Sequence, residues 1–169
     1  IGVFMSGIIA QNTLDNSGLI KSPEGGGAWN FIKKLTADGS GTALTFVDGT
    51  SDVVLDSTYK VYLFTFNNIH PATNNAAFQV NFRDGGSSYD ATKTTTLFKA
   101  RHAEDDSSSE FGYEVAYDVA QDTGVAPLTE SGIRNGNDDS LSGYMYLYDP
   151  SNTTFVKHFM ATCQYAGST

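Results

Sequence analysis

The residues best suited to chemistry in this sequence are the oxygen donors of one short loop. Asn135, Asn137, Asp138 and Asp139 surround Gly136. Carboxylate and amide oxygens are the ligands that Ca²⁺ prefers in proteins, and a glycine allows a loop to turn sharply around the ion. These four residues are therefore candidate ligands for Ca²⁺. Loops of this composition more often form plain turns, so we expect no metal and no other cofactor.

The other reactive side chains form no recognisable catalytic motif. Glu104, Glu110 and Glu114 could supply the two carboxylates of a glycoside hydrolase, but they surround an acidic, serine-rich stretch that is typical of a solvated loop. Cys163 has no sequence neighbour that would activate its thiol. No two of the three histidines have the spacing of metal ligands: His70, His102 and His158. We therefore expect that the protein is not an enzyme.

The charge balance argues against nucleic acid as a partner. The chain has 10 basic and 19 acidic residues, a formal net charge of −9. Binding to a phosphate backbone needs clustered Lys and Arg, and only Lys33 and Lys34 are adjacent. A membrane is not expected as a partner either, because no apolar run approaches the ~20 residues that span a bilayer.

The hydrophobic pattern is that of an all-β protein. Short runs rich in Val, Phe, Tyr and Thr alternate with clusters of Gly, Asn, Asp and Ser. This pattern predicts an antiparallel β-sandwich, jelly-roll-like, of about 8–9 strands. A turn at residues 38–41 should close a hairpin. The candidate strands are residues 28–36, 42–47, 59–69, 76–83, 94–101, 111–117, 124–129, 141–148 and 155–165.

One predicted strand carries tyrosines at alternate positions. Tyr144, Tyr146 and Tyr148 share one face, and Met145 and Leu147 share the other. Tyrosines on a sheet are often half-buried packing residues whose hydroxyls contact water. The alternatives are a contact between subunits or an aromatic platform for a glycan. The three tyrosines are therefore candidate interface or glycan-binding residues.

Residues 1–27 differ from the remainder and predict an extended arm with a glycine-rich tether. The tether ends in three glycines at 25–27 and resists regular structure. The apolar residues before it would be poorly soluble if uncovered, so the arm should dock on its own domain or on a neighbouring subunit. Residues 28–169 then form one β-sandwich domain. The candidate anchoring residues are Ile1, Val3, Phe4, Met5, Ile8 and Ile9.

Five separated motifs, in a fixed order, carry a resemblance to a known family. They are AWNFI at 28–32, TA at 36–37 with ALTF at 43–46, DSTY at 56–59 with Tyr62 and Phe64, NIHPAT at 68–73 and DGGSSY at 84–89. The chain resembles small virion structural proteins of tailed bacteriophages, known mainly from marine and cyanobacterial phages. The likeness extends from Ala28 to the strand that contains residues 155–159.

The resemblance implies a non-enzymatic structural component of a phage virion. It would be exposed as a head decoration or cement protein, or as part of the tail fibre or adsorption apparatus. Its partners would be copies of itself, in a homo-oligomer expected to be trimeric, and other virion proteins. It would be assembled in the host cytoplasm and lie on the virion exterior. The alternative is a carbohydrate- or receptor-binding module of the tail, whose partner is a host surface glycan.

Overall fold

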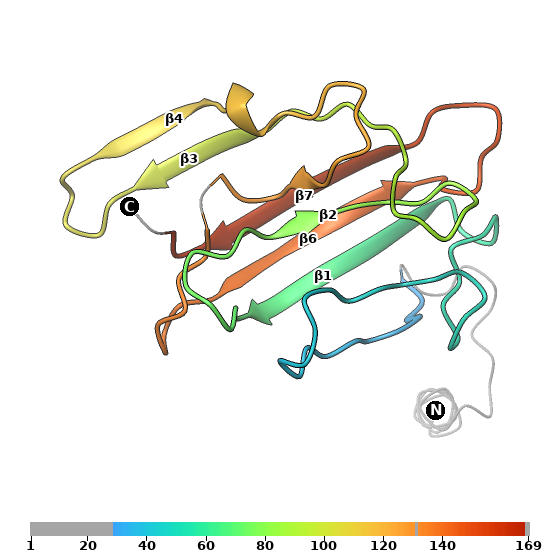
Figure 1. Ribbon diagram of the computed structural model, residues 1–169, viewed down its shortest axis with the longest axis horizontal. Coiled ribbons are helices and arrows are strands. Elements are labelled where there is room, and N and C mark those ends of the chain that lie inside the picture. Colours follow the sequence, from blue (N-terminus) through green and yellow to red (C-terminus); the bar gives the residue numbers. More distant parts are fainter. Residues whose placement is uncertain (1–28, 131, 168–169) are drawn as a thin grey trace, which may run out of the picture. The chain divides into compact units, whose positions relative to one another are not determined.

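The computed structural model describes residues 29–130 and 132–167 (Figure 1). The described residues contain seven strands, one short 3₁₀ helix and no α-helix, and every strand pair is antiparallel. The all-β class is therefore confirmed, whereas the sandwich and its jelly-roll connection stay predictions. The elements are β1 (Val61–Ile69), β2 (Gln79–Val80), β3 (Phe98–His102), β4 (Ser109–Tyr113), η1 (Val115–Tyr117), β5 (Ala126–Pro127), β6 (Leu141–Tyr148) and β7 (His158–Tyr165).

Among the described residues, 29–36 and 44–54 group into one compact unit, and 37–43 with 55–167 group into another. The strands predicted at 28–36 and 42–47 are wrong for the described part of these ranges, which contains no strand. The turn between them forms, since the Asp38 carboxylate accepts a hydrogen bond from the Ser40 amide at 2.9 Å. Among the described residues no backbone ladder flanks this turn, so these residues form no hairpin.

The second unit is built on a three-stranded sheet of order β1-β6-β7. The β6–β7 register runs without interruption from Leu141 opposite Tyr165 to Tyr148 opposite His158. The β1–β6 register shifts between Phe66 and Ile69. The sequence pattern located all three strands, although β7 begins at His158, three residues later than predicted.

One face of this sheet is the core. Tyr62, Met145 and Leu147 are buried on it, and Leu141 is fully buried. β2 and β5 lie over this sheet (Figure 1), and the segment that contains β2 packs there through aromatic rings. The ring of Phe66 lies 4.9 Å from that of Phe78, and the ring of Phe82 lies 5.1 Å from that of Phe159. These edge and tilted contacts are the usual geometry of aromatic packing.

The segments from 76 to 102 and from 109 to 133 run antiparallel as an interrupted ribbon. β2 pairs with β5, a bridge joins Lys93 to Asp122, and β3 pairs with β4. The runs predicted at 76–83 and 124–129 shorten to the two-residue strands β2 and β5. Of the run predicted at 111–117, only the part up to Tyr113 is strand, because η1 follows at Val115–Tyr117. Only short stretches of this ribbon therefore keep ladder geometry.

Candidate interaction surfaces

The loop proposed for Ca²⁺ is closed by its own hydrogen bonds. The Asp139 carboxylate accepts from the Gly136 amide at 3.0 Å and lies 3.8 Å from Arg134 Nε. The Gly136 carbonyl lies 2.9 Å from His70 Nε2. Asn135, Asn137 and Asp138 are exposed on the same loop. Across residues 29–130 and 132–167, no group of three His, Cys, Asp or Glu side chains is arranged to hold a metal.

The histidines and the cysteine lie in separate parts of the second unit. His102 pairs with Asp106 at 3.1 Å beside the β3–β4 turn, whereas His158 is exposed at the start of β7. Cys163 is half-buried on β7, and burial raises the pKa of its thiol. A raised pKa lowers the thiolate fraction and with it the nucleophilicity of the sulfur.

Three tyrosines form a row on the central strand of the sheet, as the alternation predicts. The rings of Tyr144 and Tyr146 lie 5.6 Å apart and edge-on, and those of Tyr146 and Tyr148 lie 6.2 Å apart and stacked. Met145 and Leu147 are buried on the opposite face. Tyr144 remains 43% exposed. Aromatic rings at these distances make favourable contacts with one another.

The residues around this row complete a surface without Asp, Glu, Lys or Arg, the tyrosine face. Leu63 and Met160 stand opposite Tyr146 on either side, and Met160 is 65% exposed. The tyrosine face contains no Asp, Glu, Lys or Arg, although the chain carries 29 such residues. Its members are Val61, Leu63, Thr65, Ser142, Tyr144, Tyr146, Tyr148, His158, Met160, Thr162 and Gln164. Depletion of charge with enrichment in Tyr and Met is typical of the centre of protein interfaces.

A second surface, which the sequence analysis did not single out, lies on the β3–β4 hairpin. Phe98 stands opposite Tyr113 with their rings 5.3 Å apart, and Ala100 stands opposite Phe111. Phe111 is 82% exposed, and Phe98, Tyr113 and the following Val115 are exposed as well. We call these five residues the hairpin face. Contiguous exposed aromatic residues of this kind mark interaction sites on soluble proteins.

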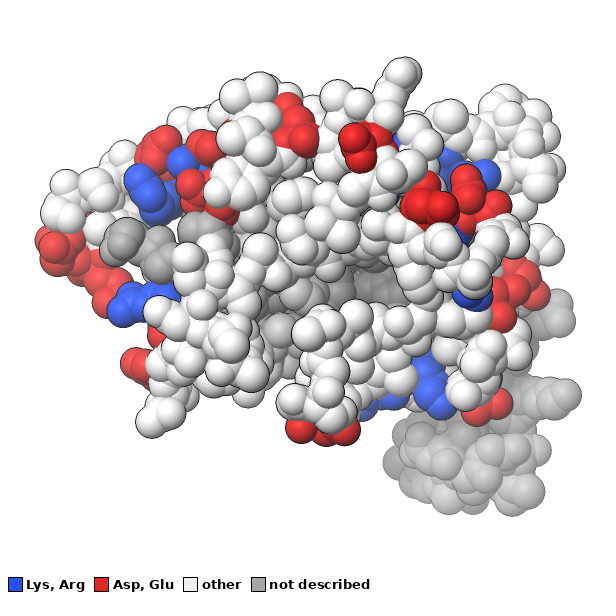
Figure 2. Space-filling view, viewed as in Figure 1, with Lys and Arg blue, Asp and Glu red and all other residues white. Residues whose placement is uncertain are grey.

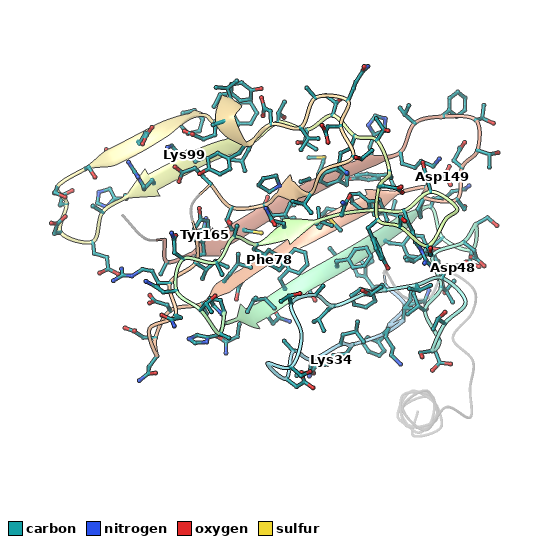
Figure 3. All side chains as sticks on the ribbon, in the orientation of Figure 1. Lys34, Asp48, Phe78, Lys99, Asp149 and Tyr165 are labelled. Atoms are coloured by element: carbon teal, nitrogen blue, oxygen red, sulfur yellow. The ribbon has the colours of Figure 1, made fainter. Side chains whose placement is uncertain are left out.

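The opposite side of the hairpin is charged, and its Lys99 side chain is turned inward. Lys99 Nζ lies 2.7 Å from Glu114, 3.2 Å from Glu110 and 3.2 Å from Glu130 (Figure 3). The Lys99 side chain is only 13% exposed, and Arg101 pairs with Glu110 at 2.8 Å. Glu114 contributes most to raising the pKa of Lys99 above its ordinary value, against the opposing effect of burial.

This charged network explains why the aromatic side of the hairpin faces outward. Successive side chains of a strand alternate between its faces, so an inward Lys99 requires an outward Phe98 and Ala100. The alternation is visible in the sequence, with aromatic residues on one face and charged residues on the other. In an alternating strand the apolar side chains usually lie inside. Here the ion pair of Lys99 with Glu130, which lies beyond the hairpin, holds the charged side inward instead.

Acidic side chains outnumber basic ones on the side of the molecule seen in Figure 2, in line with the net charge of −9. The candidate anchoring residues Ile1, Val3, Phe4, Met5, Ile8 and Ile9 lie outside the described residues. In the ranges 29–130 and 132–167, no helix has the length and hydropathy to cross a bilayer.

No family model, curated protein or solved structure matches this chain. The resemblance to phage structural proteins therefore stays a prediction that rests on the sequence motifs.

Proposed function

We propose that this chain is a non-enzymatic structural component of a bacteriophage virion that acts through contacts between subunits. It is exposed on the head as a decoration or cement protein, or is associated with the tail. The tyrosine face is the observation that carries the proposal. A sheet face without Asp, Glu, Lys or Arg, with exposed Met160 and Tyr144, loses little hydration energy when a partner covers it.

The acidic character of the other surfaces supports the same proposal. A net charge of −9 limits non-specific adhesion to DNA and uncontrolled association, both of which would hinder a protein that assembles in a host cell. The resemblance of the five sequence motifs to virion proteins of tailed phages favours a phage particle over other assemblies.

The test is the composition of purified particles of the phage that encodes this chain. We expect mass spectrometry to find the chain in an amount comparable with the known structural proteins, and antibody labelling to place it on the particle surface. A chain that is abundant in infected cells but missing from purified particles would contradict the proposal.

A carbohydrate-binding module of the phage tail is the second candidate. Its support is the row of three tyrosine rings, flanked on the same face by Thr65, Thr162 and Gln164, whose polar groups can bond to sugar hydroxyls. The readout is a glycan array with the full chain and with Tyr144, Tyr146 and Tyr148 all changed to Ser. A signal that disappears in the triple variant supports the candidate, and no signal from the parent protein rejects it.

A further inference from the structure

A stretch of backbone without a strand partner among the described residues precedes the first turn. Residues 30–36, drawn as an extended run in Figure 1, make no backbone hydrogen bond with the described part of the chain. The stretch contains Phe31, Ile32 and Leu35, all of which suit a strand, and Phe31 is 85% exposed. Its amide and carbonyl groups can be satisfied by water or by the edge of a sheet.

β4 offers such an edge. Glu114 N donates to Leu97 O, and Ala103 N donates to Ser108 O. Hydrogen-bonded pairs alternate along an antiparallel ladder, so the backbone groups of Ser109, Phe111 and Tyr113 point away from β3. No other described residue bonds to these groups. Free edges of this kind are templates for an added strand.

Electrostatics favours β4 over β3 as the edge that receives a strand. Residues 98–118 contain two basic and six acidic residues, a net charge of −4. The two basic residues, Lys99 and Arg101, both belong to β3, whereas β4 carries Glu110. Residues 30–36 contain Lys33 and Lys34, the only adjacent basic pair in the chain. The charges of the two segments are therefore complementary.

We propose that residues 30–36 of a second copy of this chain bind along the free edge of β4 as a third strand of the hairpin sheet. The inference rests on the proposed function and names the subunit contact through which it would act. Alternation places Phe31, Lys33 and Leu35 on one face of the added strand, where the two apolar side chains extend the hairpin face and cover its exposed rings. Lys34 then lies on the side that carries Glu110 and Glu114.

This contact joins two different surfaces, so it is heterologous. A heterologous contact forms a closed ring when its rotation closes and an open chain when it does not. Every copy contributes one strand and one edge, and a copy that lacks either can bind on one side only. This property provides the test.

The experiment measures the association of the full chain and of two variants by sedimentation velocity. Phe111→Pro removes an outward amide of β4 without breaking its ladder with β3. In an antiparallel added strand the amides that face β4 belong to residues 31, 33 and 35, because their side chains share the face of Phe111. Leu35→Pro removes one of these amides. We expect the parent to associate, each variant alone to associate at least about tenfold more weakly, and an equimolar mixture of the two variants to form a dimer.

Two matched controls distinguish the effect of losing a backbone amide from the effect of changing a side chain. Phe111→Ala removes the ring but keeps the amide, and Leu35→Val keeps both the amide and an apolar side chain. We expect both controls to associate more strongly than the corresponding Pro variants. Hydrogen exchange of the Lys99 and Gly112 amides, which bond within the hairpin, should be the same in the parent and in Phe111→Pro if the hairpin remains folded.

The proposal is overturned if the mixture of variants stays monomeric, if either Pro variant associates like the parent, or if Phe111→Ala weakens association as much as Phe111→Pro. A monomeric parent at about 100 µM would also overturn it, since that is a generous concentration for a subunit contact. These sedimentation results do not bear on whether purified particles contain the chain. The strand contact can therefore be rejected while the proposed function stands.

Discussion

Lys99 determines the orientation of the β3–β4 hairpin. A buried ammonium group is costly unless opposite charges surround it, and three glutamates within 3.2 Å provide that compensation. Two of them follow the turn at positions 110 and 114, and the third comes from beyond β5. Removal of the ammonium group would leave three carboxylates facing one another, so their mutual repulsion would add to the loss of the ion pairs.

We expect Lys99→Met to lower the thermal unfolding midpoint by several degrees, because it leaves like charges together in a partly buried space. The matched control is Lys60→Met. Lys60 also pairs with a carboxylate, Asp149, at 3.0 Å, but its side chain is 73% exposed. Exposed ion pairs add little to stability, so the control should shift the midpoint only slightly. Differential scanning calorimetry compares the two, and equal shifts would contradict the role of Lys99.

The stabilisation by Lys99 should also depend on pH in a defined direction. The folded state raises the pKa of Lys99 above its ordinary value of 10.5, so it holds the proton more tightly than the unfolded chain does. The contribution is therefore complete below the unfolded pKa and is lost as the pH rises through the folded one. Urea titrations measure the free energy of unfolding of the parent and of Lys99→Met. The difference between the two should be constant from about pH 7 to 9 and should shrink above about pH 10.5. A difference that grows with alkaline pH would have the wrong sign.

At the scale of elements, β6 organises the second unit because it is the central strand of the three-stranded sheet. Its two faces have opposite roles, with Leu141, Met145 and Leu147 buried in the core and the tyrosines on the outer side. Substitutions on the two faces of the same sheet should therefore differ strongly in their effect on stability.

Leu141→Ala should lower the free energy of unfolding by about 2–5 kcal/mol, since the fully buried side chain leaves a cavity in the core. Met160→Ala on the neighbouring strand is the control. Its side chain is mostly exposed on the tyrosine face, so its cost should stay within about 0.5 kcal/mol. Urea denaturation at neutral pH measures both. Similar costs would mean that the assignment of the buried face is mistaken.

The loop before β6 should be insensitive to divalent ions. Asp139 already bonds to the Gly136 amide and lies near Arg134, so its carboxylate is committed to the turn. We expect the melting temperature to remain the same in excess EDTA and in millimolar Ca²⁺. A rise in the melting temperature with Ca²⁺ that Asp139→Asn abolishes would instead support the calcium site.

At the scale of the whole molecule, the prediction concerns the N-terminal segment. Deletion of Ile1–Gly27 should abolish incorporation into particles, because the apolar residues of this segment are the expected anchor. The strands described here all lie after residue 60, so the shortened chain should keep its β-type circular dichroism spectrum. Incorporation at the parental level would remove the anchoring role, and an unfolded product would show that the segment belongs to the fold.

The sequence by itself determined the fold class and the main sheet. The shared face of Tyr144, Tyr146 and Tyr148 follows from period-two alternation. The antiparallel all-β character and the positions of β1, β6 and β7 follow from short runs of strand-forming residues between turn clusters, which is a local property. The same property predicted strands at 28–36 and 42–47, where the described residues form no ladder. Strand propensity reports which segments can pair, but a ladder also needs a partner, and the partner of β1 is about eighty residues away in the sequence.

Only the tertiary structure decided which side of the β3–β4 hairpin is inside. Alternation shows that Phe98, Phe111 and Tyr113 share a face, and the same alternation holds whether that face is buried or exposed. The choice depends on Glu130, which approaches Lys99 from 31 residues further along the chain. A long-range charge contact of this kind leaves no periodic signal, because its energy depends on distances in space that the order of residues does not specify.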